Sequence, residues 1–146
     1  MRRISRSAIV PHSAQAMFAL VDDIESYPRF LPWCVGAAVH ERSPGSVRAT
    51  LTAGLRGLRQ SFTTLNELRP PASIELRLVH GPFRRFAGAW RFEALSPHAC
   101  RVEFSLEYEL SGPLAALLQR LFDRIADSMV DAFTRRADEV YGTDPG

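Results

Sequence analysis

The stretch that decides the fold runs from Ser111 to Gly142 and reads SGPLAALLQRLFDRIADSMVDAFTRRADEVYG. Ser111-Gly112-Pro113 predicts a helix start, because a proline in the first turn lacks only an N–H that would have no partner there. Gly142 predicts the helix end. The pattern predicts one helix of roughly 30 residues, about 45 Å long, that packs on a broad apolar surface. The apolar residues recur at helical spacing, namely Leu114, Leu117, Leu118, Leu121, Phe122, Ile125, Met129, Phe133, Ala137 and Val140.

The middle of the chain supplies such a surface. From Cys34 onward apolar and polar residues alternate, which predicts strands with one buried and one solvated face. Short turn signals such as Arg56-Gly57 separate these strands, so neighbouring strands are expected to be antiparallel. The expected strands span residues 35–39, 47–55, 58–66, 74–78, 86–92 and 102–110.

The N-terminal part is expected to form a strand and two short helices. Residues 4–10 alternate imperfectly and predict the strand. Ser13 can cap the first helix, and Asp22 or Asp23 can cap the second. The segment Ile24–Cys34 follows, rich in aromatic residues and broken twice by proline.

These elements predict an α+β fold. A curved antiparallel sheet of about seven strands is expected to wrap around the long C-terminal helix, with two short helices after the first strand. We expect a single domain over residues 1–142 and a disordered tail over residues 143–146.

Composition limits the class of protein. The chain has 146 residues, a net charge of +2 and no lysine among its basic residues. That charge is too small to indicate nucleic acid or membrane binding by itself. Cys34 and Cys100 are far apart in apolar surroundings and fit reduced thiols in a cytosolic protein. No apolar run reaches the length of a membrane span, and the basic N-terminus lacks the apolar stretch of a secretory signal.

The interior is expected to be rich in large aromatic residues. A twisted sheet around one helix cannot close at both ends, so the same pattern fits a deep apolar pocket or a filled core. Few polar groups face it, among them Thr64 and Asn66. The aromatic residues offered to the interior are Phe62, Phe86, Trp90, Phe92, Phe104, Tyr108, Phe122 and Phe133.

Three local motifs, in this order, resemble one known family. They are Tyr27–Cys34 (YPRFLPWC), then Gly81–Phe83 with Gly88–Phe92, then Ala132–Ala137 running into Val140–Gly142. The chain is similar to the START or helix-grip superfamily, in its coenzyme-Q-binding and ribosome-association-toxin branch, which is related to polyketide cyclases. The resemblance implies binding of ubiquinone or a related polyprenyl lipid in support of respiratory electron transport. The alternative that it implies is a toxin that binds the large ribosomal subunit.

No catalytic or metal-binding residues are predicted. His12, His80 and His98 adjoin prolines in expected surface turns, and His40 is expected on the outer face of its strand. None has metal-ligand spacing to another ligand. A carboxylate series recurs every fourth residue of the long helix and is expected to pair with arginines of that helix, a solvated face rather than a site. The series is Asp123, Asp127 and Asp131, and the arginines are Arg120, Arg124 and Arg135.

Trp90 is the strongest candidate for ligand contact, because its plane can stack on a quinone and Gly88 leaves room beside it. Leu31, Trp33 and Phe83 belong to proline-broken turns that can form a lid. The open alternatives are a core tryptophan and a hydrophobic plug. The full set of candidate ligand-binding residues is Leu31, Trp33, Phe62, Phe83, Trp90, Phe104, Tyr108, Phe122 and Met129.

Arginine supplies the candidate docking surface. Arg84, Arg85 and Arg91 cluster near one strand and Arg135 lies near the helix end. Such a surface can bind anionic lipid headgroups or ribosomal RNA, or serve only solubility. We therefore expect a non-enzymatic lipid carrier with transient membrane contact, no DNA partner and no catalytic cofactor. The expected location is cytoplasmic, with peripheral binding to the inner membrane of a bacterium left open. A small cyclase- or hydratase-like enzyme is the weakest alternative, because no acid–base pair converges on the interior.

Overall fold

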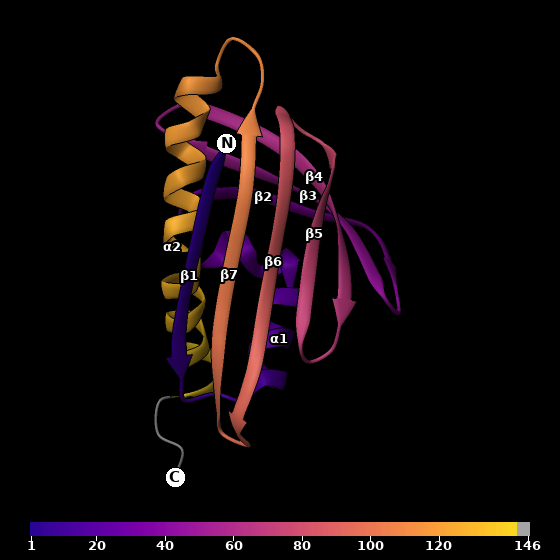
Figure 1. The fold of residues 1–146 in the computed structure, drawn as a ribbon, viewed down its shortest axis with the longest axis vertical. Helices are drawn as coiled ribbons and strands as arrows, with labels where there is room; N and C mark the ends of the chain where they lie inside the picture. The colour runs from indigo at the N-terminus through magenta and orange to yellow at the C-terminus, as the bar shows by residue number, and fades with distance from the viewer. Residues whose placement is uncertain (143–146) are drawn as a thin grey trace.

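The computed structural model describes residues 1–142, so the expected tail of residues 143–146 lies outside the described residues. One antiparallel sheet of seven strands, ordered β1-β7-β6-β5-β4-β3-β2, wraps around a long C-terminal helix (Figure 1). The predicted α+β architecture is confirmed. The elements are β1 (Arg2–Val10), α1 (Ala14–Asp22), the short 3-10 helix η1 (Ile24–Arg29), β2 (Cys34–Ser43), β3 (Ser46–Leu55), β4 (Leu58–Arg69), β5 (Ser73–His80), β6 (Phe83–Ser96), β7 (Ala99–Leu110) and α2 (Ala115–Tyr141).

The hairpins follow the turn chemistry of the sequence. Arg56 and Gly57 both have positive φ, 52° and 85°, so they form the predicted two-residue turn between β3 and β4. β1 pairs with β7 from Arg2 opposite Tyr108 to Val10 opposite Cys100. This pairing places the N-terminal strand beside α2 (Figure 1).

The long helix starts later than predicted. Gly112 has φ 91°, which a right-handed helix excludes, so the expected start at Ser111–Pro113 is a turn instead. The helix begins at Ala115, whose N–H donates to the Gly112 carbonyl at 3.3 Å. The apolar stripe is also shorter than predicted, because Leu114 and Leu117 are each 52% exposed and Val140 is 50% exposed. Periodicity does not reveal where the covering surface stops.

Phe133 joins α2 to the sheet and to the segment after α1. It is fully buried, with ring centroids 5.1 Å from Trp90, 5.3 Å from Tyr27 and 5.1 Å from Phe30. Trp90 in turn stacks on Phe92 with the rings 4° from parallel. This cluster fills one end of the space between sheet and helix.

A second aromatic cluster fills the other end. Phe83 contacts Phe62, Tyr108 and Phe122, with ring centroids between 5.0 and 6.2 Å away. The space predicted beside Gly88 is also taken, because a Cβ there would meet Leu76 at 3.1 Å and Leu106 at 3.3 Å. The interior at these positions is therefore a packed core.

Candidate ligand-binding site

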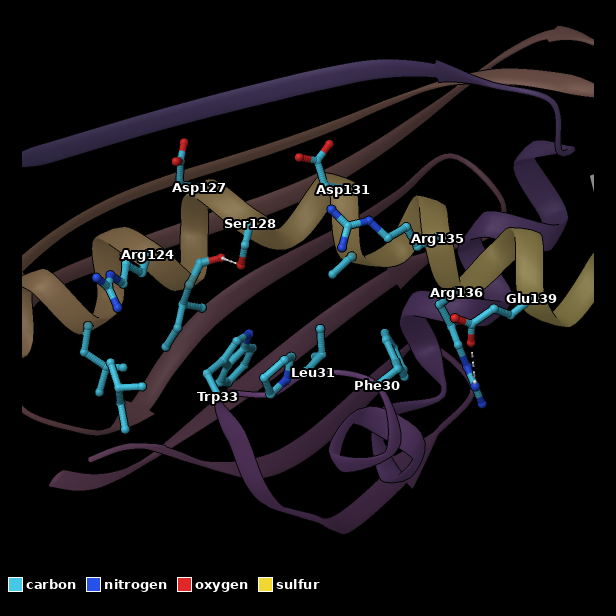
Figure 2. A pocket seen from close by; sticks show the side chains of 15 residues that line it. Phe30, Leu31, Trp33, Arg124, Asp127, Ser128, Asp131, Arg135, Arg136 and Glu139 are labelled. Carbon is cyan, nitrogen blue, oxygen red and sulfur yellow. Dashed lines mark hydrogen bonds and ion pairs between the residues drawn. The ribbon is translucent and has the colours of Figure 1, made fainter. Parts of the chain in front are cut away.

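A pocket of about 600 Å³ lies between residues 30–33, the end of β3 and one side of α2 (Figure 2). Its volume falls in the range of small-molecule sites. One wall is apolar, and the helix supplies a mixed wall of apolar and charged side chains. The lining residues are Phe30, Leu31, Pro32, Trp33, Leu55, Leu121, Arg124, Ile125, Asp127, Ser128, Asp131, Ala132, Arg135, Arg136 and Glu139.

Backbone hydrogen bonds hold the apolar wall in place. The Leu31 N–H donates to the Tyr27 carbonyl at 2.9 Å, and the Cys34 N–H donates to the Leu31 carbonyl at 2.9 Å. The Gly54 N–H donates to the Trp33 carbonyl at 2.8 Å, which ties the segment to β3. Pro28 lies just before this segment and Pro32 lies within it, so residues 30–33 form neither a regular α-helix nor a strand. The segment therefore presents its side chains toward α2 as a fixed wall.

The buried Tyr27 phenol connects this wall to α1. Its hydroxyl donates to the Val21 carbonyl at 2.5 Å, which links the segment to α1. Burial raises the pKa of the Tyr27 phenol, and the nearby Asp22 carboxylate raises it further. The phenol is therefore neutral at physiological pH and serves as a hydrogen-bond donor.

One end of the pocket is closed by Arg136. Its guanidinium lies 5.1 Å from the centre of the Phe30 ring, a cation–π contact, and 3.6 Å from the Glu139 carboxylate. Figure 2 shows these three side chains together at the C-terminal part of α2.

Two carboxylates of α2, Asp123 and Asp127, find partners on β1 rather than on their own helix. Asp123 pairs with Arg2 at 3.0 Å, and Asp127 pairs with Arg6. The predicted pairing with arginines of the helix is therefore wrong for these two carboxylates. The reason is topological, since β1 runs beside α2 and its arginines meet carboxylates one helical turn apart. Within residues 1–142, Arg124 and Arg135 form no ion pair, so both rim the pocket as unpaired cations.

Two buried nitrogen atoms of the pocket lining lack hydrogen-bond partners among the described residues. They are Trp33 Nε1 and Arg136 Nε. Trp33 is 8% exposed, whereas the Arg136 side chain is 23% exposed. By contrast, the Ser128 hydroxyl on the opposite wall donates to the Ile125 carbonyl at 3.0 Å. The pocket lining thus contains two hydrogen-bond donors that are unpaired within residues 1–142.

The structure separates the residues that the sequence singles out. Leu31 and Trp33 line the pocket, while the other seven candidate ligand residues lie in the packed core, so their contact with a ligand stays a prediction. The seven are Phe62, Phe83, Trp90, Phe104, Tyr108, Phe122 and Met129.

The arginines proposed for docking are also divided. Arg135 lines the pocket, whereas Arg84, Arg85 and Arg91 are exposed on β6. Arg91 lies 4.0 Å from Glu103.

The sequence analysis missed much of the helix wall. The sequence pattern assigns Leu121 and Ile125 to the core, includes Ala132 only in the family motif Ala132–Ala137, and gives no role to Ser128. The signal available was their spacing, since residues 121, 125, 128 and 132 follow one side of a helix that also carries Arg124 and Arg135. A stripe that mixes apolar and charged residues indicates a boundary between core and solvent.

His12 is the clearest correction among the histidines. It is 5% exposed rather than in a surface turn, and its Nε2 lies 2.7 Å from Asp138 Oδ1. The end of β1 meets the last turns of α2, so a part-buried polar pair joins them. His40, His80 and His98 are exposed as predicted. Residues 1–142 contain no group of side chains arranged to hold a metal ion. No helix among them is long and apolar enough to span a membrane.

The fold and pocket fit a known class of ligand-binding domains. Residues 10–134 match the family described as polyketide cyclase/dehydrase and lipid transport. The chain belongs to this family.

Two curated relatives refine the placement. The ribosome association toxin RatA of Escherichia coli (strain K12) is 46% identical over 142 residues, which cover 97% of this chain and 90% of that protein. The mitochondrial coenzyme Q-binding protein COQ10 homolog B of Xenopus laevis is 28% identical over 143 residues, 94% of this chain and 59% of that protein. The resemblance to the coenzyme-Q-binding and ribosome-association-toxin branch is confirmed.

A solved structure confirms the helix-grip fold. The Zhui aromatase/cyclase of Streptomyces sp. R1128 superposes with a TM-score of 0.83, covering 94% of this chain and 93% of that chain. The sequences are 16% identical, so this likeness shows the fold alone.

Replacing Tyr27 by phenylalanine tests the support of the pocket wall. Loss of the hydrogen bond to Val21 should lower the free energy of unfolding by about 1 kcal/mol at neutral pH. Folding raises the phenol pKa, so its contribution is complete below about pH 10 and is lost as the pH rises further, by up to about 1.4 kcal/mol per pH unit. Urea unfolding from neutral pH to above pH 10 should therefore give a steeper decline for the wild type than for Tyr27→Phe. Tyr141→Phe, at a 45% exposed site, should change the slope less. If the unfolding free energy declined equally with pH in the wild type and in Tyr27→Phe, the raised pKa of the buried Tyr27 phenol would be contradicted.

Proposed function

We propose that this protein is a carrier for an amphipathic lipid of the polyprenyl quinone type, held in the pocket between residues 30–33 and α2. The observation that carries the proposal is the pocket itself, with one apolar wall and a charged rim. An apolar wall beside charged side chains suits a molecule with a hydrocarbon part and a polar head.

The energetics favour a hydrocarbon occupant. The lining has apolar side chains from both walls, namely Phe30, Leu31 and Trp33 from residues 30–33, and Leu121 and Ile125 from α2. Each methylene transferred from water to such a surface contributes about 0.8 kcal/mol. A few carbons of a polyprenyl chain therefore outweigh a small rearrangement of the wall.

The class of lipid is supported by the family. A quinone carrier agrees with the relative named coenzyme Q-binding protein, and it would support respiratory electron transport. We place the protein in the cytoplasm of a bacterium, with transient binding to the inner membrane where such lipids reside.

Carriage without catalysis is part of the proposal. Thr64 and Asn66 are the buried polar residues on the inner face of β4, and the Thr64 hydroxyl donates to the Asn66 side-chain oxygen at 2.8 Å. These two side chains are hydrogen-bonded to each other, and neither is titratable. Tyr108 donates to Asp123, but that carboxylate is held by Arg2 outside the pocket lining. This arrangement supports binding rather than acid–base chemistry.

An exposed apolar surface adjoins the pocket and suits the membrane contact. Leu114 and Leu117 are each 52% exposed, and Leu55 is 39% exposed. Leu117 lies one helical turn before Leu121, which lines the pocket together with Leu55 and Arg124. Leucines that enter the acyl layer beside an arginine that meets anionic headgroups would place the pocket at the bilayer surface.

Filling the pocket tests the lipid site. Ala132→Trp inserts a large ring from the helix wall, whereas Ala116→Trp places the same ring at an exposed position outside the lining. We expect mass spectrometry of organic extracts, from protein purified without detergent, to find near-stoichiometric polyprenyl quinone with the wild type and Ala116→Trp. Ala132→Trp should carry at least about 10-fold less. Retention of lipid by a folded Ala132→Trp would place the ligand elsewhere.

Removing exposed leucines tests the membrane contact. The double variant Leu114→Ser/Leu117→Ser should sediment with phosphatidylglycerol vesicles at least about 10-fold less than the wild type, because two apolar side chains no longer enter the bilayer. The matched control is Ile9→Ser/Leu95→Ser, which removes two exposed apolar residues elsewhere, 72% and 50% exposed. Equal losses in both variants would show that this surface has no special role.

A second candidate function is ribosome association. The relative named ribosome association toxin RatA matches 97% of this chain at 46% identity. The surface for it is the exposed pair Arg84 and Arg85, which form no ion pair within the described part of the chain. Arginine at an exposed site can contact RNA phosphates without a bound ligand.

Co-sedimentation with purified large ribosomal subunits tests this candidate. Binding through arginine and phosphate should weaken steeply as salt rises. Arg84→Ala/Arg85→Ala should reduce binding at low salt by at least about 10-fold. Arg69→Ala/Arg101→Ala, which removes the same charge from other exposed positions, should not. No sedimentation of the wild type, or equal loss in both variants, would reject docking through this pair.

A further inference from the structure

We propose that Trp33 is the polar anchor of this pocket, and that its indole N–H donates a hydrogen bond to a neutral carbonyl oxygen in the ligand's head group. The inference rests on the proposed lipid site and names what that site recognises. A lipid with a quinone, ketone or ester carbonyl would then bind better than a hydrocarbon of the same shape.

The first support is the unpaired donor. Trp33 is 8% exposed, and its Nε1 is buried with no hydrogen-bond partner among residues 1–142. An indole nitrogen can only donate, so neither a change of tautomer nor a rotation of the ring at its place turns it into an acceptor. Buried donors in native proteins are nearly always paired, which makes an unpaired one in a pocket wall informative. An acceptor atom on a bound ligand would give the Trp33 N–H its missing hydrogen bond.

The second support is the placement of the ring. The Trp33 carbonyl is held by the Gly54 N–H at 2.8 Å, and Pro32 restricts the backbone before it. In Figure 2 the indole nitrogen lies on the edge of the ring nearest α2, toward Ser128. The Ser128 hydroxyl already donates a hydrogen bond to the Ile125 carbonyl. The Trp33 N–H is therefore the uncharged donor that is left for a ligand between residues 30–33 and α2. Because Nε1 is buried, the proposal requires the ring to rotate so that the N–H meets a ligand in the pocket.

The third support concerns the charge of the head group. The lining contains three arginine and three carboxylate side chains, so its formal charge sums to zero. Arg136, whose Nε is also unpaired, already faces Glu139 at 3.6 Å. The Trp33 N–H is an uncharged donor on the apolar wall, so a neutral carbonyl acceptor suits it. The charged lining residues are Arg124, Arg135, Arg136, Asp127, Asp131 and Glu139.

The test compares two probes that share a tail and differ in the head, a decyl-substituted benzoquinone and decylbenzene. Trp33→Phe keeps an aromatic ring and removes the N–H. The chain has two tryptophans, so proton–nitrogen correlation NMR shows two indole signals, which Trp33→Phe and Trp90→Phe assign. Thermal unfolding of Trp33→Phe checks that the fold is retained.

We expect the benzoquinone to move the Trp33 indole proton downfield in the wild-type protein, and decylbenzene not to do so. Trp33→Phe should bind the benzoquinone about 10-fold more weakly, the loss expected for one buried hydrogen bond, with its affinity for decylbenzene unchanged.

The other outcomes overturn the inference in distinguishable ways. Equal benzoquinone affinity in wild type and Trp33→Phe would remove the anchor and leave the lipid site standing. Weaker binding of both probes by a folded Trp33→Phe would show that the ring acts by packing alone. If the wild type binds neither probe, the anchor and the proposed lipid site both fail.

Discussion

The packing of Phe133 against two other parts of the chain, the sheet and the segment after α1, is the contact on which the structure depends. This helical side chain is fully buried between Trp90 of the sheet and the Tyr27–Phe30 segment. It therefore sets the distance of α2 from the sheet and the position of the segment beside the helix. Removing a buried phenylalanine of this kind typically costs several kcal/mol, about 3–5. The pocket wall and the hydrophobic core share this one side chain.

This constraint explains why the pocket lies beside α2 and outside the aromatic clusters. Aromatic clusters around Trp90 and Phe83 fill the space between sheet and helix, where a deep cavity was one of two expectations. Exposed side chains of α2 such as Arg124 and Arg135 then meet residues 30–33, where Leu31 and Trp33 belong to the buried core. The site thus lies at the boundary of the core, where apolar and charged residues are neighbours.

Much of the fold could be predicted because it depends on local patterns. The alternation of residues 102–110 and the turn at Arg56-Gly57 each carry their structure in a few adjacent residues. Apart from the start of α2, the errors concern contacts between distant segments. His12 meets Asp138 and Arg2 meets Asp123 only after β1 is placed beside α2, and no local pattern encodes that pairing.

The candidate site shows the same limit. Leu31 and Trp33 were found because their motif is local, but their partners Ser128 and Ala132 are almost a hundred residues away. Helical spacing alone assigns each residue either to the core or to the surface, whereas the lining of this pocket contains residues of both kinds. The unpaired Trp33 nitrogen is likewise visible only in three dimensions, since it depends on the absence of an acceptor among its neighbours within residues 1–142.

The most direct test of the central claim is to locate a bound lipid by NMR, from nuclear Overhauser effects between a decyl-substituted benzoquinone and protein methyl groups. The account predicts contacts with the methyls of Leu55, Ile125 and Ala132, which line the pocket. It predicts none with Ile74 or Val102, which are buried in the core. Contacts with the core methyls would show that the ligand enters between sheet and helix, and would contradict the account.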